Sequence, residues 1–166
     1  MRQNLGKLLA IVIFGLAFGQ LEAIVVYYLQ TILGSGTQYL TSGYKTLLNL
    51  GVVAFIVPNH PILKSVHLVS IEMLREAATI FMLVTLSFVA AKNSVSRLGA
   101  FLISFGLWDI FYYVSLFFLI GWPRSLFDLD VFFLIPVAWV GPVITPLVIS
   151  STFVVLGIAL FTRNND

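Results

Sequence analysis

The stretch S-I-E-M-L-R-E-A-A-T-I-F, residues 70–81, places three charged side chains inside a long apolar segment. Glu72, Arg75 and Glu76 fall within little more than one helical turn, because an α-helix has about 3.6 residues per turn. A charge at the centre of a membrane helix costs about 2.5 to 3.5 kcal/mol on insertion scales, so such residues usually face the interior of a bundle and serve a function. The stretch therefore predicts a membrane helix that carries part of a buried polar site.

The composition of the whole chain is that of an integral membrane protein. Its 166 residues are 60% hydrophobic and 10% charged, against about 25% charged residues in a soluble domain, and the mean hydropathy is +1.04. Apolar segments recur to residue 161 without a signal cleavage site, so we expect the first to be retained as a spanning helix. The lack of cysteine excludes disulfides and thiolate chemistry. No basic run is long enough to predict nucleic-acid binding.

We predict an all-α fold, a bundle of about four transmembrane helices in a single domain over residues 1–166. A spanning helix needs about 20 mostly apolar residues, and four segments meet this requirement: roughly 8–33, 66–91, 98–121 and 143–161. The apolar segments 47–57 and 131–140 are too short to cross, so we expect partial helices that are re-entrant or interfacial. Pro136, Pro142 and Pro146 interrupt the path into the last span, and broken helices of this kind often line binding sites in transporters.

The distribution of basic residues favours four spans and cytoplasmic termini. Four spans place five basic residues on one side (Arg2, Lys7, Lys92, Arg97 and Arg163) and three on the other (Lys45, Lys64 and Arg124). Lys and Arg are in excess on the cytoplasmic side of membrane proteins. A fifth span at 47–57 would divide the charges evenly, so the four-span topology is preferred.

Small residues recur along one face of the first span. Gly15, Gly19 and Ala23 are four residues apart, a spacing that lets another helix approach closely. We favour packing within the chain over dimerisation at this face. The predicted partners are the lipid bilayer and, through the Gly15/Gly19 face, a second copy or a larger membrane complex.

Acidic residues within the predicted spans form the candidate site. Glu22, Glu72, Glu76 and Asp109 all fall there, on one side of the bundle centre or close to it. Glu72 and Glu76 share a helical face and would repel each other, and Arg75 can neutralise only one charge. Bound protons or a hard divalent cation would remove the rest. The alternative is that the acids are only interhelical hydrogen-bonding groups around Arg75.

Roles for individual residues follow from these positions. The residues predicted to carry the chemistry are Glu22, Glu72, Arg75, Glu76 and Asp109, and the predicted metal ligands are Glu22, Glu72, Glu76 and Asp109. The candidate walls of a binding site are Tyr112, Tyr113 and Trp139, although a place in the core or at the interface is favoured for a single tyrosine and Trp139 could equally face lipid. His67 is a poorer ligand candidate because five residues separate it from Glu72, about 140° around a helix. Asp128 and Asp130 precede the broken segment on the same side of the membrane.

Three classes of function remain open at this point. The leading hypothesis is a buried carboxylate and arginine site that handles protons or a hard divalent metal ion. The second is a membrane enzyme that uses the acids as general acid and base on a lipid-soluble or small substrate. The third is a non-catalytic subunit of a larger complex. Phosphate-binding loops and the H-E-x-x-H and G-x-S-x-G motifs do not occur, so we do not expect a nucleotide-driven pump.

Overall fold

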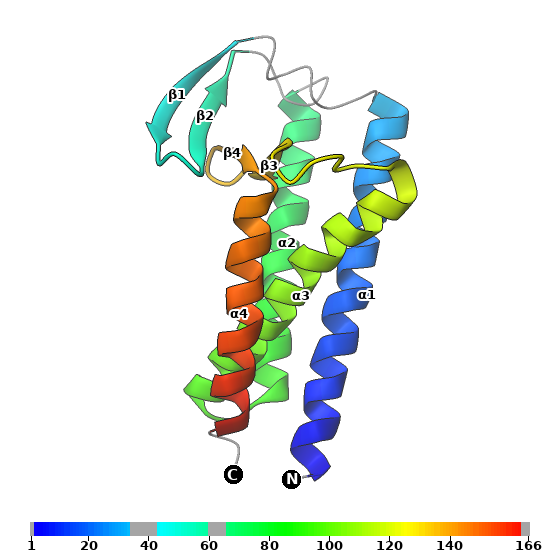
Figure 1. Ribbon diagram of the computed structural model, residues 1–166, viewed down its shortest axis with the longest axis vertical. Coiled ribbons are helices and arrows are strands. Elements are labelled where there is room, and N and C mark those ends of the chain that lie inside the picture. Colours follow the sequence, from blue (N-terminus) through cyan, green and yellow to red (C-terminus); the bar gives the residue numbers. More distant parts are fainter. Residues whose placement is uncertain (1, 34–42, 60–65, 164–166) are drawn as a thin grey trace.

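The computed structural model contains four long helices with a small antiparallel sheet at one end (Figure 1). It describes residues 2–33, 43–59 and 66–163. The helices are α1 (Arg2–Leu33), α2 (Val66–Ala90), α3 (Ser94–Ile120) and α4 (Ile144–Arg163). Each is long and apolar enough to cross a membrane, which confirms the prediction of four membrane-crossing helices by length and composition.

The sheet corrects the all-α prediction. Its strands are β1 (Tyr44–Asn49), β2 (Ala54–Pro58), β3 (Leu129–Phe133) and β4 (Ala138–Pro142), in the order β1-β2-β4-β3 with antiparallel pairing throughout. The segments 47–57 and 131–140 are therefore parts of two hairpins. The partial helices predicted for them are not present.

Local backbone chemistry explains both hairpins. In the first, Gly51 has a φ of +82°, a conformation that glycine adopts without steric cost, and the Leu50 N–H donates to the Val53 carbonyl at 2.9 Å to close the turn. In the second, Pro136 lies between the strands, and proline cannot continue a helix interior because it lacks an N–H and clashes with the preceding turn. The β-branched and aromatic residues on either side suit strands better than helices.

Helix α3 is the centre of the bundle. It packs extensively against α1 and α4 and less against α2, whereas α1 and α2 contact each other little. In Figure 1, α3 runs obliquely among the other three helices. The fold is thus organised around one helix with three neighbours.

Glycines let the helices approach α3 at backbone distance. A Cβ at Gly15 would lie 2.9 Å from Leu107 Cβ, and a Cβ at Gly19 would lie 2.5 Å from the Trp108 carbonyl oxygen. The predicted small-residue stripe on α1 therefore contacts a helix of the same chain. Gly99 on α3 and Gly157 on α4 face each other in the same manner, since a Cβ on either would lie 2.8 Å from the other's carbonyl oxygen.

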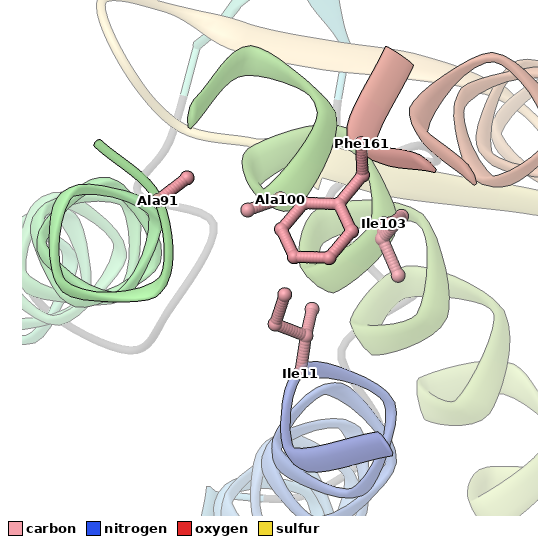
Figure 2. Packing of buried hydrophobic residues seen from close by; sticks show 5 residues of the cluster. All are labelled: Ile11, Ala91, Ala100, Ile103 and Phe161. Carbon is pink, nitrogen blue, oxygen red and sulfur yellow. The ribbon is translucent and has the colours of Figure 1, made fainter. Parts of the chain in front are cut away.

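A compact apolar cluster closes the end of the bundle opposite the sheet. Figure 2 shows Phe161 of α4 beside Ala100 and Ile103 of α3, with Ile11 of α1 facing it and Ala91 at the end of α2. All five side chains are buried. Because the cluster joins all four helices, it fixes this end of the bundle.

Both termini lie at this end of the bundle (Figure 1). Lys7 lies near the start of α1, Lys92 and Arg97 flank the start of α3, and Arg163 ends α4, so these four basic residues belong to the same end. The arrangement agrees with the four-span topology. Which side of the membrane it occupies stays a prediction, with the termini expected in the cytoplasm.

Candidate functional site

Arg75 joins two carboxylates and explains the charged turn within α2. Its Nη1 donates to Glu22 of α1, and its Nε donates to Glu72 Oε1 at 2.9 Å, one helical turn earlier. The Glu22 and Glu72 side chains are only 10% and 12% exposed, and that of Arg75 is 25% exposed. The predicted association of these three residues is therefore present in the structure, and it forms the polar link between α1 and α2.

Glu76 has a different partner from its neighbours. Its carboxylate accepts the backbone N–H of Leu134, which follows β3, at 2.9 Å through Oε2 and at 3.2 Å through Oε1. Glu76 is buried, and this contact ties α2 to the second hairpin. The repulsion expected between Glu72 and Glu76 is thus reduced, because each carboxylate has its own donor.

Asp109 and Asp130 each accept from one hydroxyl group. The Ser150 hydroxyl of α4 donates to Asp109 of α3 at 2.7 Å, and the Tyr113 hydroxyl of α3 donates to Asp130 of β3 at 2.9 Å. Asp130 lies outside the membrane-crossing helices. Burial raises the pKa of Asp130 to about 7, although the bonds from Tyr113 and from the Val131 backbone oppose this rise.

Tyr112 and Tyr113 lie next to each other on α3, with ring centroids 4.8 Å apart. The Tyr112 hydroxyl is near enough to the carboxylates of Asp130, Glu22 and Asp109 to interact with them electrostatically. Of the two tyrosines predicted to line a binding site, Tyr113 thus bonds an acid directly, and Tyr112 contacts its ring.

Trp139 packs within an aromatic cluster beneath the sheet. Its ring centroid lies 5.0 Å from that of Phe55 and 5.9 Å from that of Phe133, and Trp108 of α3 also contacts Phe133. The indole N–H groups of Trp108 and Trp139 are buried and have no hydrogen-bond partner among the described residues. Trp139 thus connects β4 with β2 and β3, whereas the sequence predicted only a pocket wall.

The described residues contain no cluster of ligands of the kind that the metal prediction requires. Within 2–33, 43–59 and 66–163, no three His, Asp or Glu side chains come together in a way that could hold a metal ion. His67 lies exposed in the first turn of α2, near the sheet end. A metal role for Glu22, Glu72, Glu76, Asp109 and His67 therefore stays a prediction without a structural basis.

Asp128 bonds backbone groups of its own turn, unlike the other acids described above. Its carboxylate accepts the backbone N–H groups of Arg124 and Ser125 at 2.8 and 3.0 Å, and the Ser125 hydroxyl accepts the N–H of Phe127 at 3.2 Å. Two side chains of this stretch thus bond backbone N–H groups of the same turn. A structural role accounts for Asp128.

An apolar groove of about 370 Å³ lies between α1 and α2. It is lined by Phe14, Phe81, Met82, Thr85, Leu86 and Val89. None of the acids lines it, so the groove does not bring a substrate to the carboxylates.

Three features of the site and its surroundings were missed by sequence reasoning. Ser150, the partner of Asp109, lies in an apolar segment, and only the rotation of α4 brings it to α3. The backbone N–H of Leu134 has no side-chain signal at all. The Gln20 side chain, which accepts from the Ser115 hydroxyl at 2.9 Å between α1 and α3, was likewise not singled out.

Comparisons with known proteins give no further guidance. No family model, no curated protein and no solved structure matches this chain. The function must therefore be inferred from the site.

Proposed function

We propose that this chain is a membrane protein that binds and releases protons through the carboxylates beneath its sheet. The observation that carries the proposal is the imbalance of charge in this region. Arg75 makes the ion pairs with Glu22 and Glu72, and no other acid in the described ranges has an ion pair. Glu76, Asp109 and Asp130 instead accept from an amide or a hydroxyl group.

A proton is the counter-charge that fits these three acids best. An ionised carboxylate in a low-dielectric environment is costly unless it is paired with a cation, and a bound proton removes the charge at its source. A metal ion would need several ligands in one place, and no such group occurs in the described part of the chain. Separate carboxylates with separate neutral donors therefore favour protons over a metal.

Each of these acids also connects two elements of the fold. Glu76 joins α2 to the residue after β3, Asp109 joins α3 to α4, and Asp130 joins β3 to α3. Gain or loss of a proton changes the strength of these bonds, because an ionised acceptor forms stronger hydrogen bonds than a neutral one. Proton binding would therefore be coupled to how tightly the sheet and α4 are held against the bundle.

The other two hypotheses lack a comparable observation. The enzyme hypothesis needs a path for substrate to the acids, and the apolar groove between α1 and α2 has no acid in its lining. The subunit hypothesis used the Gly15/Gly19 face for a partner, and that face contacts α3. Proton handling is accordingly the function we favour.

Infrared difference spectroscopy of the protein in lipid nanodiscs tests the proposal. Between acidic and alkaline pH we expect the carbonyl band of protonated carboxyl groups to appear and disappear. Glu76→Gln and Asp109→Asn should each remove part of that signal, because both replacements keep a hydrogen-bond acceptor but cannot titrate.

Asp128→Asn is the matched control, since Asp128 serves a turn and lies outside the group. It should leave the buried carboxyl band unchanged. In parallel, vesicles containing the protein and an internal pH dye should take up protons after an acid pulse, with reduced uptake in the Glu76 and Asp109 variants. If these variants match the wild type in both assays, the acids have only a structural role and the proposal fails.

A further inference from the structure

The turn of the first hairpin has an unusual composition for an exposed loop. The side chains of Leu47, Leu48, Leu50 and Val52 are 52%, 52%, 60% and 59% exposed. No charged residue lies between Leu47 and Val53, although exposed turns normally consist of polar residues, glycine and proline. With Asn49 and Gly51 between them, these four residues make up the turn end of the hairpin, which we call the apolar tip below.

Two contacts fix the position of the apolar tip relative to α4. The Thr145 hydroxyl, in the first turn of α4, donates to the Val52 carbonyl at 3.0 Å. The same carbonyl oxygen lies 2.5 Å from where a Cβ at Gly141 would be, so the turn approaches the end of β4 at backbone distance. In Figure 1 the turn of the β1–β2 hairpin lies beside β4, where α4 begins, and its open end lies higher in the view, above the start of α4.

The length of α4 places its first turn, and with it the turn of the first hairpin, at the membrane boundary. Helix α4 has 20 residues, which corresponds to about 30 Å at 1.5 Å per residue. The hydrocarbon core of a bilayer is also about 30 Å thick, so α4 can cross only if its two ends lie at the two boundaries. Thr145 and the Val52 carbonyl bonded to it therefore lie close to the boundary on the sheet side.

We propose that the β1–β2 hairpin is a lipid anchor whose apolar tip inserts into the membrane leaflet on the side opposite the termini. The occupant of this apolar surface is the lipid itself, at the boundary between headgroups and acyl chains. Lys45 supports this orientation, since its charged side chain is exposed and lies at the opposite end of β1, where the residue pairs with Val57. The proposal does not depend on the proton-handling function.

Backbone hydrogen bonding is compatible with this shallow insertion. The two strands of the hairpin bond to each other, and the Leu50 N–H donates to Val53 within the turn. The Asn49 side chain accepts the Gly51 N–H at 2.8 Å. The turn can therefore enter the interface with several of its polar backbone groups already paired, as the low polarity of that region requires.

The absence of cysteine from the chain allows a direct test with single-cysteine variants. Leu48→Cys, Leu50→Cys and Val52→Cys would each be labelled with an environment-sensitive fluorophore and reconstituted in phosphatidylcholine nanodiscs. Lys45→Cys is the matched control on the same hairpin, and Phe81→Cys, 72% exposed on α2, is the control inside the bilayer. The readouts are quenching by iodide in water and by phosphatidylcholine that carries a nitroxide near the top of its acyl chain.

We expect labels at the apolar tip to be quenched by the nitroxide lipid and to lose most of the iodide quenching seen at Lys45. Tip labels that match the Lys45 label in both readouts would overturn the proposal. The tip labels could also be protected from iodide only when two copies share a nanodisc, with energy transfer between the labels of the two copies. That result would overturn the proposal in favour of pairing between the β1 edges of the two copies. All the substituted side chains are exposed, and any one variant that misfolds leaves two others to decide the outcome.

Discussion

Replacement of Gly19 by alanine tests the central packing claim, that α1 contacts α3 at backbone distance. The added methyl carbon would lie 2.5 Å from the Trp108 carbonyl oxygen and 3.0 Å from both Phe111 Cβ and Tyr112 N. A carbon to carbonyl oxygen contact needs about 3.3 Å, so the two helices would have to separate by roughly 0.8 Å. The obstacle is backbone, which cannot move aside as a side chain does.

The cost can be estimated from the consequences of that separation. Overpacking of a well-packed interior costs typically about 1 to 3 kcal/mol, and a gap of 0.5 to 1 Å forfeits roughly a quarter to a half of each dispersion contact along the interface. Alanine regains up to about 1 kcal/mol through its helix propensity. We therefore expect Gly19→Ala to lower the free energy of unfolding by about 1 to 2 kcal/mol.

Unfolding in mixed micelles with increasing dodecyl sulfate, followed by tryptophan fluorescence, measures this change. Gly6→Ala is the control, because it lies on the same helix and a Cβ there meets nothing within 4 Å. The control should unfold at the wild-type midpoint or slightly above it. A Gly19→Ala protein as stable as Gly6→Ala would refute the packing of α1 on α3.

Three further predictions concern the site and its surroundings. The pKa of Asp130 is raised to about 7 from an ordinary value of about 4, so its bound proton stabilises the folded state fully below pH 4, and this contribution is lost as the pH rises to about 7. The melting temperature of Asp130→Asn should therefore fall less than that of the wild type between these pH values. An equal fall in both proteins would contradict the raised pKa of Asp130. Arg75→Leu should lower the free energy of unfolding by about 3 kcal/mol, which is near the lower limit for breaking a buried ion pair because the Arg75 side chain is 25% exposed. In the same unfolding assay, the double variant with Glu22→Gln should recover part of this loss. Leu83→Ala, at a fully buried position, should cost about 2 to 5 kcal/mol, whereas Phe81→Ala, at a position that is 72% exposed on the same helix, should change the midpoint little; similar losses in both would show that α2 is rotated differently.

The four helices were predictable because their signal is local. The length of an apolar run is read directly from the sequence, and about 20 residues are the length that a helix needs to cross the bilayer. The pairing of Glu72 with Arg75 was equally accessible, since residues three apart on a helix are neighbours. Depth in the membrane was enough to place Glu22 at the same level as these residues, because the first two helices run in opposite directions, but it did not identify Glu22 as a partner of Arg75.

The sheet could not be predicted in this way because its pairing is not local. Residues 47–57 read as one apolar run, in which Asn49 and Gly51 are the only signs of a turn. The strand that completes the pairing, β4, begins 80 residues after β2 ends, at Ala138 against Pro58. Neither the sequence of residues 47–57 nor that of β4 alone indicates that the two segments pair.

The same limit applies to the partners of the acids. Glu76 bonds a backbone N–H at Leu134, a donor that every residue except proline carries. Asp109 bonds Ser150, and this pairing depends on the rotation of α4, which composition does not report. The sequence was enough to place Glu76 and Asp109 within the helices, but their individual donors required the tertiary structure.

The central place of α3 has a consequence for the insertion of the chain into the membrane. Synthesis proceeds from the N-terminus, so α1 and α2 emerge before the helix on which both of them pack. Until α3 arrives, the link between Glu22 and Arg75 is a polar contact that these two helices can already make, and it compensates charge that would otherwise hinder their transfer into lipid. We therefore expect α1 and α2 to enter the membrane together as a helical hairpin before α3 is inserted.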